Sequence, residues 1–458
     1  MTTEQPVVHS LPSPAVAESP PFSARSAGMR IGALFGPAVF GVTAAGVALP
    51  KVSVALHATP AQAAWVLTAH ALALGVGTAL FGRLGDALGV RATLLVGSLV
   101  LLLGTGICVS APNLGTLVAG RFVLAAGSGA MTSGALTLAA SGDPAQRPKV
   151  LAGFGGTMAV FSASATLMGG VVTQWMTWRL TVVLPVLSLL AVPFCLPLAT
   201  RPGSRKSIDV PGAALLTATV SALLVLIQSP TLSLSTPVVL TLVAIVVVAA
   251  AGLTARVRQS PEGFVQRSLA TDGTFLLAGA IGIGVYAGLF AAMYAVPQIL
   301  VKSYGWSVFQ IGFALLPGAA IGAIVSRLAG KLTSGKGGNI LLAGAAVASA
   351  VLIGIAGING GGAWLLVSGA SLGFAAFAVT QVVTTGLMSV RIPPQRRGGA
   401  MGLLNLTFFV GGGMGSGAAG ALAKSMELTS ALGLVAVLPL VSGLLALVLS
   451  NGRQKPAA

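Results

Sequence analysis

The stretch Gly82-Arg83-Leu84-Gly85-Asp86-Ala87-Leu88-Gly89-Val90-Arg91 places three charged residues and three glycines between two long apolar segments. The flanking segments are 62–82 and 92–111. A helix needs about 20 apolar residues to cross the hydrocarbon core of a bilayer, and each segment meets that requirement. The stretch therefore predicts a short, charged loop between two transmembrane helices.

The composition of the whole chain agrees with a membrane environment. Hydrophobic residue types make up 55% of the 458 residues, and charged types make up only 7%. A water-soluble protein of this size could not cover its surface with so few charges. In lipid, a polytopic chain satisfies its backbone polar groups most simply by forming helices. We therefore expect an all-α polytopic membrane protein.

Apolar segments of sufficient length predict about fourteen spans. The two shortest, 211–228 and 237–253, begin at or beside a proline, which suits the first turn of a helix. The expected spans are 31–50, 62–82, 92–111, 114–140, 150–172, 179–198, 211–228, 237–253, 273–298, 309–329, 339–358, 363–389, 398–422 and 430–450.

Lysine and arginine set the expected orientation. With both ends in the cytoplasm, the cytoplasmic segments hold 20 of the 25 positive residues. The outer loops hold Lys51, Arg179, Lys302 and Lys424, and Arg121 lies inside a span. Such an asymmetry is typical of the positive-inside rule. It also accounts for the net charge of +17 through contact with lipid headgroups, so no nucleic-acid partner is expected.

A weak internal symmetry divides the chain into two halves. The basic, glycine-containing segment 326–332 follows the tenth span as 82–91 follows the second, provided that the two short spans form an insert. This gives an arrangement of six, two and six helices. The expected parts are a disordered cytoplasmic tail (1–30), a six-helix bundle (31–200), a linker with two extra spans (201–272), a second six-helix bundle (273–450) and a cytoplasmic tail (451–458).

Several chemical functions find no support in the sequence. Cys108 and Cys195 lie in apolar runs, and three histidines form no cluster with them, so neither a disulfide framework nor a metal site is expected. The chain has no Walker-type phosphate-binding motif and no nucleophile constellation. We expect no enzyme activity, no cofactor and a monomeric protein in the cell membrane.

Taken together, the motifs resemble those of the fourteen-span drug:proton antiporters of the major facilitator superfamily, over nearly the whole chain after residue 30. Segment 82–91, with Asp86 and Arg91, is similar to that superfamily's loop motif between spans two and three. Further resemblance lies in 65–68, Trp178, Arg179, Pro185, 209–212, Gln298, 304–307, 315–317, Asn405, Gly411, Gly412 and Gly415. The resemblance implies the major facilitator fold and export of drugs coupled to proton influx.

The chain also departs from the family pattern. Gly41 stands where the family has an Asp in the first span, and Gly46 stands where it has an Asn. Leu124 and Ala125 replace a Gln-Gly pair that follows the fourth-span Arg. Other departures are 165–170, which lacks a Gly-Pro pair, and Phe408 with Phe409, which replace an Arg-Gln pair.

Two residues inside spans are candidates for charge or proton coupling. Arg121 is the one lysine or arginine in the interior of a predicted span rather than at its end, near mid-depth. Charged groups in a membrane are costly and often functional, although an arginine can also clamp helices through backbone carbonyls. His70 can titrate near neutral pH, or it can be a neutral, buried imidazole. No acidic residue falls in the middle of a predicted span, so proton coupling would use His70, an end-of-helix acid such as Asp272, or the substrate.

The loop residues Arg83, Asp86 and Arg91 are expected to form a cytoplasmic gate. A carboxylate near a helix N-terminus can hold one conformation and be released in another. The alternative is a solvated acid without a mechanical role.

The substrate cavity is expected to be apolar with a few polar groups. Aromatic and polar residues at helical spacing supply the candidates, although any one of them could serve packing or lipid contact instead. They are Met158, Phe161, Tyr286, Phe290, Tyr294, Phe374, Phe377, Gln381, Asn405, Phe408 and Phe409.

The leading functional expectation is an exporter of hydrophobic small molecules, neutral or anionic, by alternating access and with coupling to protons. Two alternatives stay open at this point. One is a lipid or secondary-metabolite exporter with atypical or absent proton coupling. The other is a transport-inactive membrane sensor or scaffold.

Overall fold

The computed structural model describes residues 23–141, 145–200, 202–205, 207–331, 336–393 and 396–451, and these residues are helical with short connections and no strand. The expected all-α membrane architecture is confirmed. The N-terminal half comprises α1 (Ala24–Phe35), η1 (Gly36–Gly41), α2 (Thr43–Ala55), α3 (Pro60–Leu88), α4 (Val90–Val109), α5 (Leu114–Ser141), α6 (Arg147–Trp175), α7 (Trp178–Val183), η2 (Leu184–Leu190), α8 (Val192–Cys195) and η3 (Leu196–Leu198), where η marks a 3-10 helix.

The rest of the chain forms a helical hairpin and a second half. The hairpin comprises α9 (Val210–Ile227), α10 (Ser229–Leu232) and α11 (Thr236–Gln259). The C-terminal half comprises α12 (Arg267–Ala270), α13 (Gly273–Tyr304), α14 (Val308–Lys331), α15 (Gly337–Ile358), α16 (Ala363–Arg391), α17 (Arg397–Leu422), α18 (Leu428–Val435) and α19 (Val437–Asn451).

Twelve helical stretches among the described residues are long and apolar enough to cross a membrane. Two of the fourteen expected spans are not among them. In α14 the apolar stretch covers only Val308–Gly322, and α17 is rich in glycine. The total of fourteen spans therefore stays a prediction, as do the boundaries of the five expected parts.

The stretch 82–91 is more helical than the sequence suggested. Thr59 and Gln62 form a capping box at the start of α3, with N–H···O distances of 3.2 and 2.9 Å. The helix then continues through Leu88 and turns sharply at Gly89, whose φ of 91° favours glycine. The expected loop is therefore the last turns of α3, a corner at Gly89 and the start of α4, because no proline interrupts 82–91.

Proline residues break the first and sixth spans. Pro37 lies at the start of η1, and Pro185 at the start of η2, and the two 3-10 segments pack against each other. Helix α1 begins at Ala24, inside the segment expected to be a tail, because Ser23 caps it. The remainder of the two expected tails, 1–22 and 452–458, lies outside the described residues.

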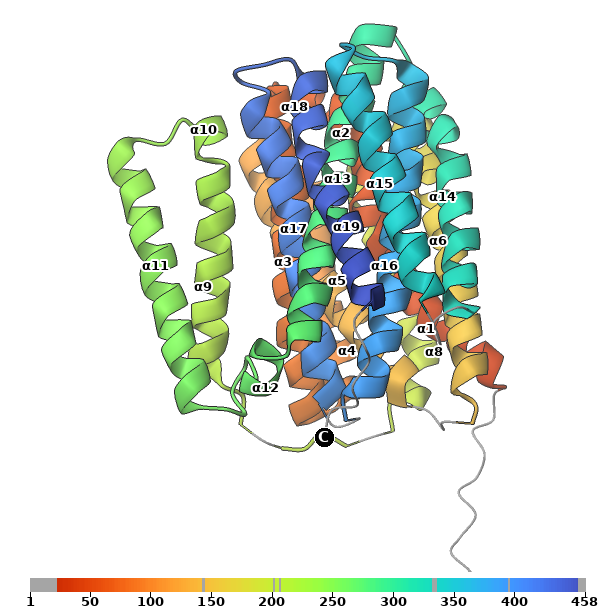
Figure 1. The fold of residues 1–458 in the computed structure, drawn as a ribbon, viewed down its shortest axis with the longest axis vertical. Coiled ribbons are helices and arrows are strands. Elements are labelled where there is room, and N and C mark those ends of the chain that lie inside the picture. The colour runs from red at the N-terminus through yellow and green to blue at the C-terminus, as the bar shows by residue number, and fades with distance from the viewer. Residues whose placement is uncertain are drawn as a thin grey trace, which may run out of the picture.

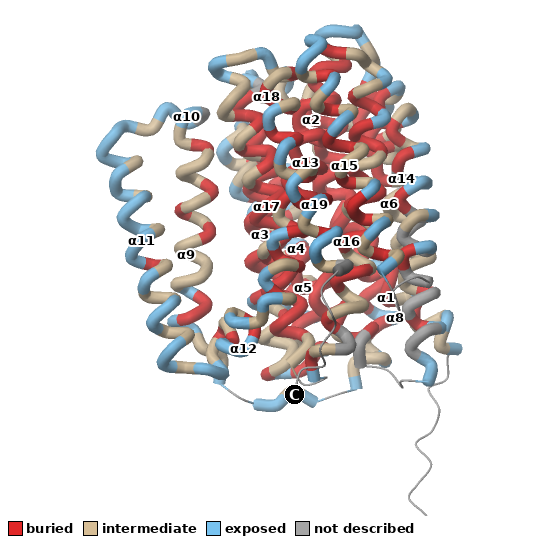
Figure 2. Tube along the Cα trace, in the orientation of Figure 1, coloured by how far each residue is buried: buried red, intermediate tan, exposed pale blue. Residues whose placement is uncertain are grey.

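The two halves pack side by side, with α3 on α17, α6 on α14 and α2 on α13 (Figure 1). The contact of α3 with α17 runs along the membrane-crossing direction. A Cβ at Gly402 would lie only 2.7 Å from the Thr78 carbonyl oxygen, and the Thr68 and Ser416 hydroxyls are 3.0 Å apart. Small residues permit this approach. Red, buried segments fill the interface between the halves (Figure 2).

The α9–α11 hairpin lies beside the bundle, where α9 contacts α3 and α17 and α11 is largely exposed (Figures 1 and 2). We call the end of the molecule that carries Arg83, Arg256, Arg391 and Arg396 the basic end; it lies near α12 in Figure 1. At the opposite end, Lys424 donates to the Pro230 carbonyl and lies 3.1 Å from the Ser233 hydroxyl.

Asp209 fastens the hairpin at the basic end. Its carboxylate accepts hydrogen bonds from the Gly212 and Phe264 N–H groups at 3.1 and 2.9 Å, and pairs with Arg256 at 3.0 Å. Burial alone would raise the pKa of Asp209, but these three donors outweigh burial and lower it. The charged carboxylate thus stabilises the folded hairpin.

We predict that Asp209→Asn lowers the free energy of unfolding of the detergent-solubilised protein by about 1.5–3 kcal/mol at neutral pH, because hydrogen bonds to a charged carboxylate are lost. The folded-state pKa is lowered, so the stabilisation is present above the unfolded pKa of about 4 and is lost as pH falls through the folded value. The stability difference between the two proteins should therefore shrink in acid.

Glu262→Gln is the matched control, because the Glu262–Arg396 pair at 3.0 Å has side chains 60% and 43% exposed. An equal loss of stability in both variants at neutral pH would contradict the assignment to Asp209.

Candidate functional site

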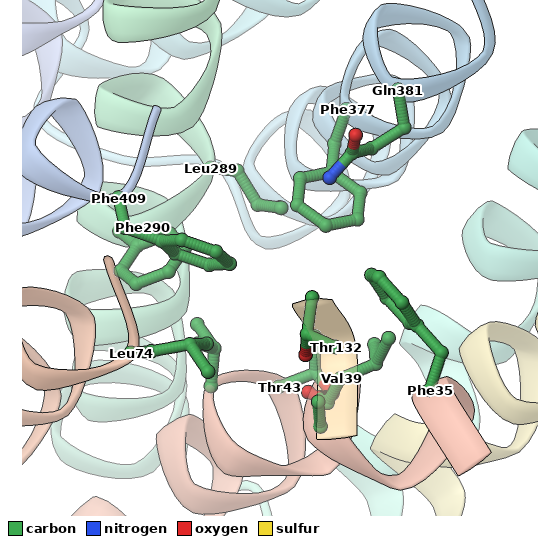
Figure 3. Close-up of a pocket in the computed structure, with 12 residues that line it drawn as sticks. Phe35, Val39, Thr43, Leu74, Thr132, Leu289, Phe290, Phe377, Gln381 and Phe409 are labelled. Carbon is green, nitrogen blue, oxygen red and sulfur yellow. Dashed lines mark hydrogen bonds between the residues drawn. The ribbon is translucent and has the colours of Figure 1, made fainter. Parts of the chain in front are cut away.

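A small cavity lies between the two halves, near the middle of the bundle. It encloses about 20 Å³, on the order of one water molecule. Side chains from both halves surround it in Figure 3: Phe35, Ala38, Val39, Val42, Thr43, Leu74 and Thr132 from the first half, and Leu289, Phe290, Phe377, Gln381 and Phe409 from the second.

An aromatic cluster forms the wall on the side of the C-terminal half. The Tyr286 ring lies 4.7 Å from Phe377, 5.1 Å from Phe408 and 5.5 Å from Phe409, measured between centroids. Phe290 adds a contact to Phe409 at 6.3 Å. Such tilted and edge-on pairs are favourable, and they leave an apolar surface toward the cavity.

Three polar side chains face this apolar space: Thr43, Thr132 and Gln381. The Gln381 amide nitrogen donates to Asn405 at 3.0 Å, and Asn405 donates to the Met401 carbonyl at 2.9 Å. Asn405 thereby fixes the Gln381 amide, whose remaining polar atoms can meet a bound molecule. A few fixed polar groups in an apolar pocket are typical of small-molecule sites.

The predicted lining residues separate into three groups. Phe290, Phe377, Gln381 and Phe409 line the cavity. Five others do not line it and are buried elsewhere in the C-terminal half: Tyr286, Tyr294, Phe374, Asn405 and Phe408. Met158 and Phe161 lie on α6, partly buried, and the Phe161 ring packs against Phe40 at 5.6 Å. Substrate contact stays a prediction for all eleven.

Sequence reasoning missed the contribution of the first span. Phe35, Ala38, Val39, Val42 and Thr43 come from α1, η1 and the start of α2. The Gly36-Pro37 pair was the available signal, because a helix break in the middle of a span often marks a binding site.

Arg121 does not line this cavity but is fully buried within the N-terminal half. Its guanidinium donates to the Val182 carbonyl at 2.7 Å, to the Val66 carbonyl at 3.4 Å and to the Gly41 carbonyl. Arg121 thus joins α5 to α7, α3 and η1. This is the clamp arrangement that the sequence left as an alternative to a direct role in binding.

His70 is fully buried beside the same clamp. A Cβ built on Gly41 would lie 2.1 Å from His70 Nε2, so the imidazole fills the space that a side chain at position 41 would need. Neither ring nitrogen has a hydrogen-bond partner among the described residues. The glycine that replaces the family's first-span Asp is therefore the residue that accommodates this histidine.

At the basic end, Asp86 and Arg83 join the two halves and the linker. Asp86 accepts the Gly399 N–H at 2.9 Å, at the N-terminus of α17, where free N–H groups favour an anion. Arg83 donates to the Gly263 and Phe264 carbonyls at 2.6 and 2.7 Å. Arg91 is exposed on α4. The corresponding segment 326–332 lies partly outside the described residues.

The opposite end carries an aromatic contact between the halves. The Trp175 ring at the end of α6 lies 4.8 Å from Phe309 at the start of α14. The two halves are therefore in contact at both ends, through Asp86 at the basic end and through this ring pair at the other.

Several antibiotic export and resistance proteins are similar in sequence. The cephamycin export protein CmcT of Amycolatopsis lactamdurans is 30% identical over 414 residues, 82% of this chain and 80% of that protein. The puromycin resistance protein pur8 of Streptomyces alboniger is 30% identical, over 67% of this chain and 62% of that protein. A tetracenomycin C resistance and export protein of Streptomyces glaucescens is 26% identical, over 84% of this chain and 73% of that protein.

Solved transporters share the fold. The xylose transporter XylE of E. coli, in a partially occluded inward-open conformation, matches with a TM-score of 0.61 and 12% identity, over 95% of this chain and 99% of that one. A POT family transporter bound to a thioalcohol-conjugated peptide gives a TM-score of 0.66 with 15% identity, over 94% and 97%. Residues 31–416 match the sequence pattern of one family, and with the fold and the exporters above they show that this chain belongs to the Major Facilitator Superfamily.

Proposed function

We propose that this protein exports hydrophobic small molecules, such as antibiotics, by alternating access. The observation that carries the proposal is the small, aromatic-lined cavity between two helical halves. Relatives named for puromycin resistance and for cephamycin export support the substrate class. Opening the interface at one end at a time would expose the cavity to each side in turn.

The charges around the cavity favour neutral or anionic substrates. The described acidic residues, Asp86, Asp209, Glu262, Asp272 and Glu427, all lie at helix ends or in connections. A cationic substrate would find no carboxylate in the cavity, whereas the Arg121 guanidinium lies behind its wall. A substrate without positive charge avoids this unfavourable electrostatic environment.

Proton coupling is proposed to act through His70. It is a buried titratable group without a hydrogen-bond partner among the described residues, and it lies where the family's acid would otherwise reach. Protonation next to the Arg121 guanidinium would place two positive charges together and weaken the clamp on Gly41. Asp272 is less suited, because it caps α13 and pairs with Arg391 at 3.3 Å.

A lipid or secondary-metabolite exporter with absent proton coupling is the second candidate. Its support is Gly41, which removes the carboxylate that the family pattern has in the first span. The protein is proposed to lie in the cell membrane with the basic end in the cytoplasm. A sensor or scaffold has no specific structural observation in its favour.

The cavity assignment predicts the effect of Phe290→Ala. The variant should raise the substrate concentration for half-maximal transport on the order of tenfold, because a buried phenyl group is lost. Drug-resistance profiling in a susceptible host, with puromycin and a cephamycin in the panel, first identifies a substrate. Flux of that substrate into proteoliposomes then gives the value.

Phe313→Ala is the control, because Phe313 is 61% exposed on α14. Equal effects of the two variants would argue against the cavity as the binding site. Absence of flux for every compound in the panel would favour the scaffold.

The coupling proposal predicts that His70→Ala transports when substrate alone is concentrated on one side but no longer responds to an imposed pH gradient. Uptake into vesicles with and without the gradient measures this. His57→Ala is the control, since His57 is exposed at the end opposite the basic end. A full response to the gradient in His70→Ala would remove His70 from the mechanism.

The orientation can be tested with single cysteines. Cys108 and Cys195 are buried and should not react, whereas Arg258 and Lys302 are exposed at opposite ends. In intact cells, a membrane-impermeant maleimide should label Lys302→Cys, and it should label Arg258→Cys only after permeabilisation. The reverse pattern would invert the proposed topology.

A further inference from the structure

A second cavity, separate from the central one, opens on the side of the N-terminal half. We call it the lateral crevice. It has a volume of about 330 Å³ and shares no lining residue with the central cavity. Its walls come from α1, α6, η2 and α8: Arg30, Ala33, Phe161, Leu187, Leu190, Ala191 and Phe194.

Helix α1 forms the floor of the lateral crevice. It packs against α6 on one side and against η2 and α8 on the other. The Cys195 thiol donates to the Arg30 carbonyl at 3.4 Å and so holds α8 to α1. At the rim, Leu190 and Phe194 are 70% and 58% exposed. Apolar side chains this exposed on a transmembrane segment face lipid, so the crevice opens toward the hydrocarbon.

The lining of the crevice suits an amphiphile with an anionic headgroup. Arg30 is its one charged lining residue, and none of the lining side chains is acidic. Arg30 lies in the second turn of α1, near the basic end, and a long arginine side chain there can extend toward the phosphates of the lipid headgroups. The remaining lining residues offer a continuous apolar surface that ends at Phe161, about 21 Å along α6 from its first residue.

We propose that the lateral crevice is a binding site for an anionic phospholipid of the leaflet at the basic end. The headgroup phosphate pairs with Arg30. One acyl chain lies along Leu187, Leu190 and Phe194 and reaches Phe161.

A lipid seated in the crevice would be linked to a wall of the central cavity through Phe161. The Phe161 ring, which closes the inner end of the crevice, packs on Phe40 of η1. Ala38 and Val39 of the same 3-10 segment line the central cavity. The bound chain therefore supports η1 from the side facing lipid. The proposal concerns lipid binding alone and holds whether or not the protein exports drugs.

The test is native mass spectrometry of the full-length protein, purified in detergent and exchanged with equal amounts of phosphatidylglycerol and phosphatidylcholine. Wild type should retain phosphatidylglycerol preferentially. Arg30→Gln should lower that retention roughly fivefold, the effect of one basic residue at a membrane surface. Arg25→Gln, an exposed residue of the same helix, is the matched control and should retain it as wild type does.

Two further variants test the proposal even if Arg30→Gln folds poorly. Arg30→Lys keeps the charge and should retain phosphatidylglycerol, whereas Ala33→Phe keeps Arg30 but fills the crevice and should lose it. Equal losses in Arg30→Gln and Arg25→Gln, or full retention in Ala33→Phe, would overturn the proposal. Loss of substrate flux in Ala33→Phe with unchanged lipid retention would assign the crevice to the transported compound instead and would also overturn it.

Discussion

A guanidinium buried in a membrane protein must have all of its charge stabilised by nearby acceptors, and Arg121 meets this constraint with backbone carbonyls of three elements. Two of those carbonyls lie beside 3-10 segments: Gly41 ends η1, and Val182 lies just before η2. The first and sixth spans can therefore break at the same depth while remaining joined to α5 and α3. The position of the central cavity depends on this junction, because η1 supplies part of its wall.

The two ends of the interface between the halves are held by contacts of different kinds. At the basic end the contacts are polar. Asp86 of α3 accepts a hydrogen bond from the start of α17, and Arg83 of α3 donates to the connection before α12. At the opposite end an aromatic pair, Trp175 and Phe309, contributes. Water can replace the partners of a polar contact, whereas separating an apolar contact exposes apolar surface to water at a cost in free energy. Under the proposed mechanism, the two ends would open at different energetic cost.

Much of the architecture was predictable, because uninterrupted apolar runs of sufficient length have few alternatives to transmembrane helices. The stretch 82–91 shows where this reasoning loses precision. Hydropathy ends a span at Gly82, whereas hydrogen bonding continues α3 to Leu88, where only the glycine corner stops it. The extent of η1 and η2 was likewise beyond prediction, since Pro37 and Pro185 mark a break but not the length of the 3-10 segment that follows.

The candidate site was predictable only in part, for two physical reasons. Helix α13 is buried on nearly every side, so the spacing of Tyr286, Phe290 and Tyr294 could not show which ring faces the cavity. The partners of Arg121 are main-chain carbonyls, which every residue has, so no side-chain pattern in the sequence could predict them.

The contact between Gly41 and His70 also constrains how the protein can evolve. A side chain at position 41 requires the imidazole to move, whereas a smaller residue at position 70 leaves room for it. Substitutions at the two positions are therefore coupled: the side chains that position 41 accepts depend on the residue at position 70.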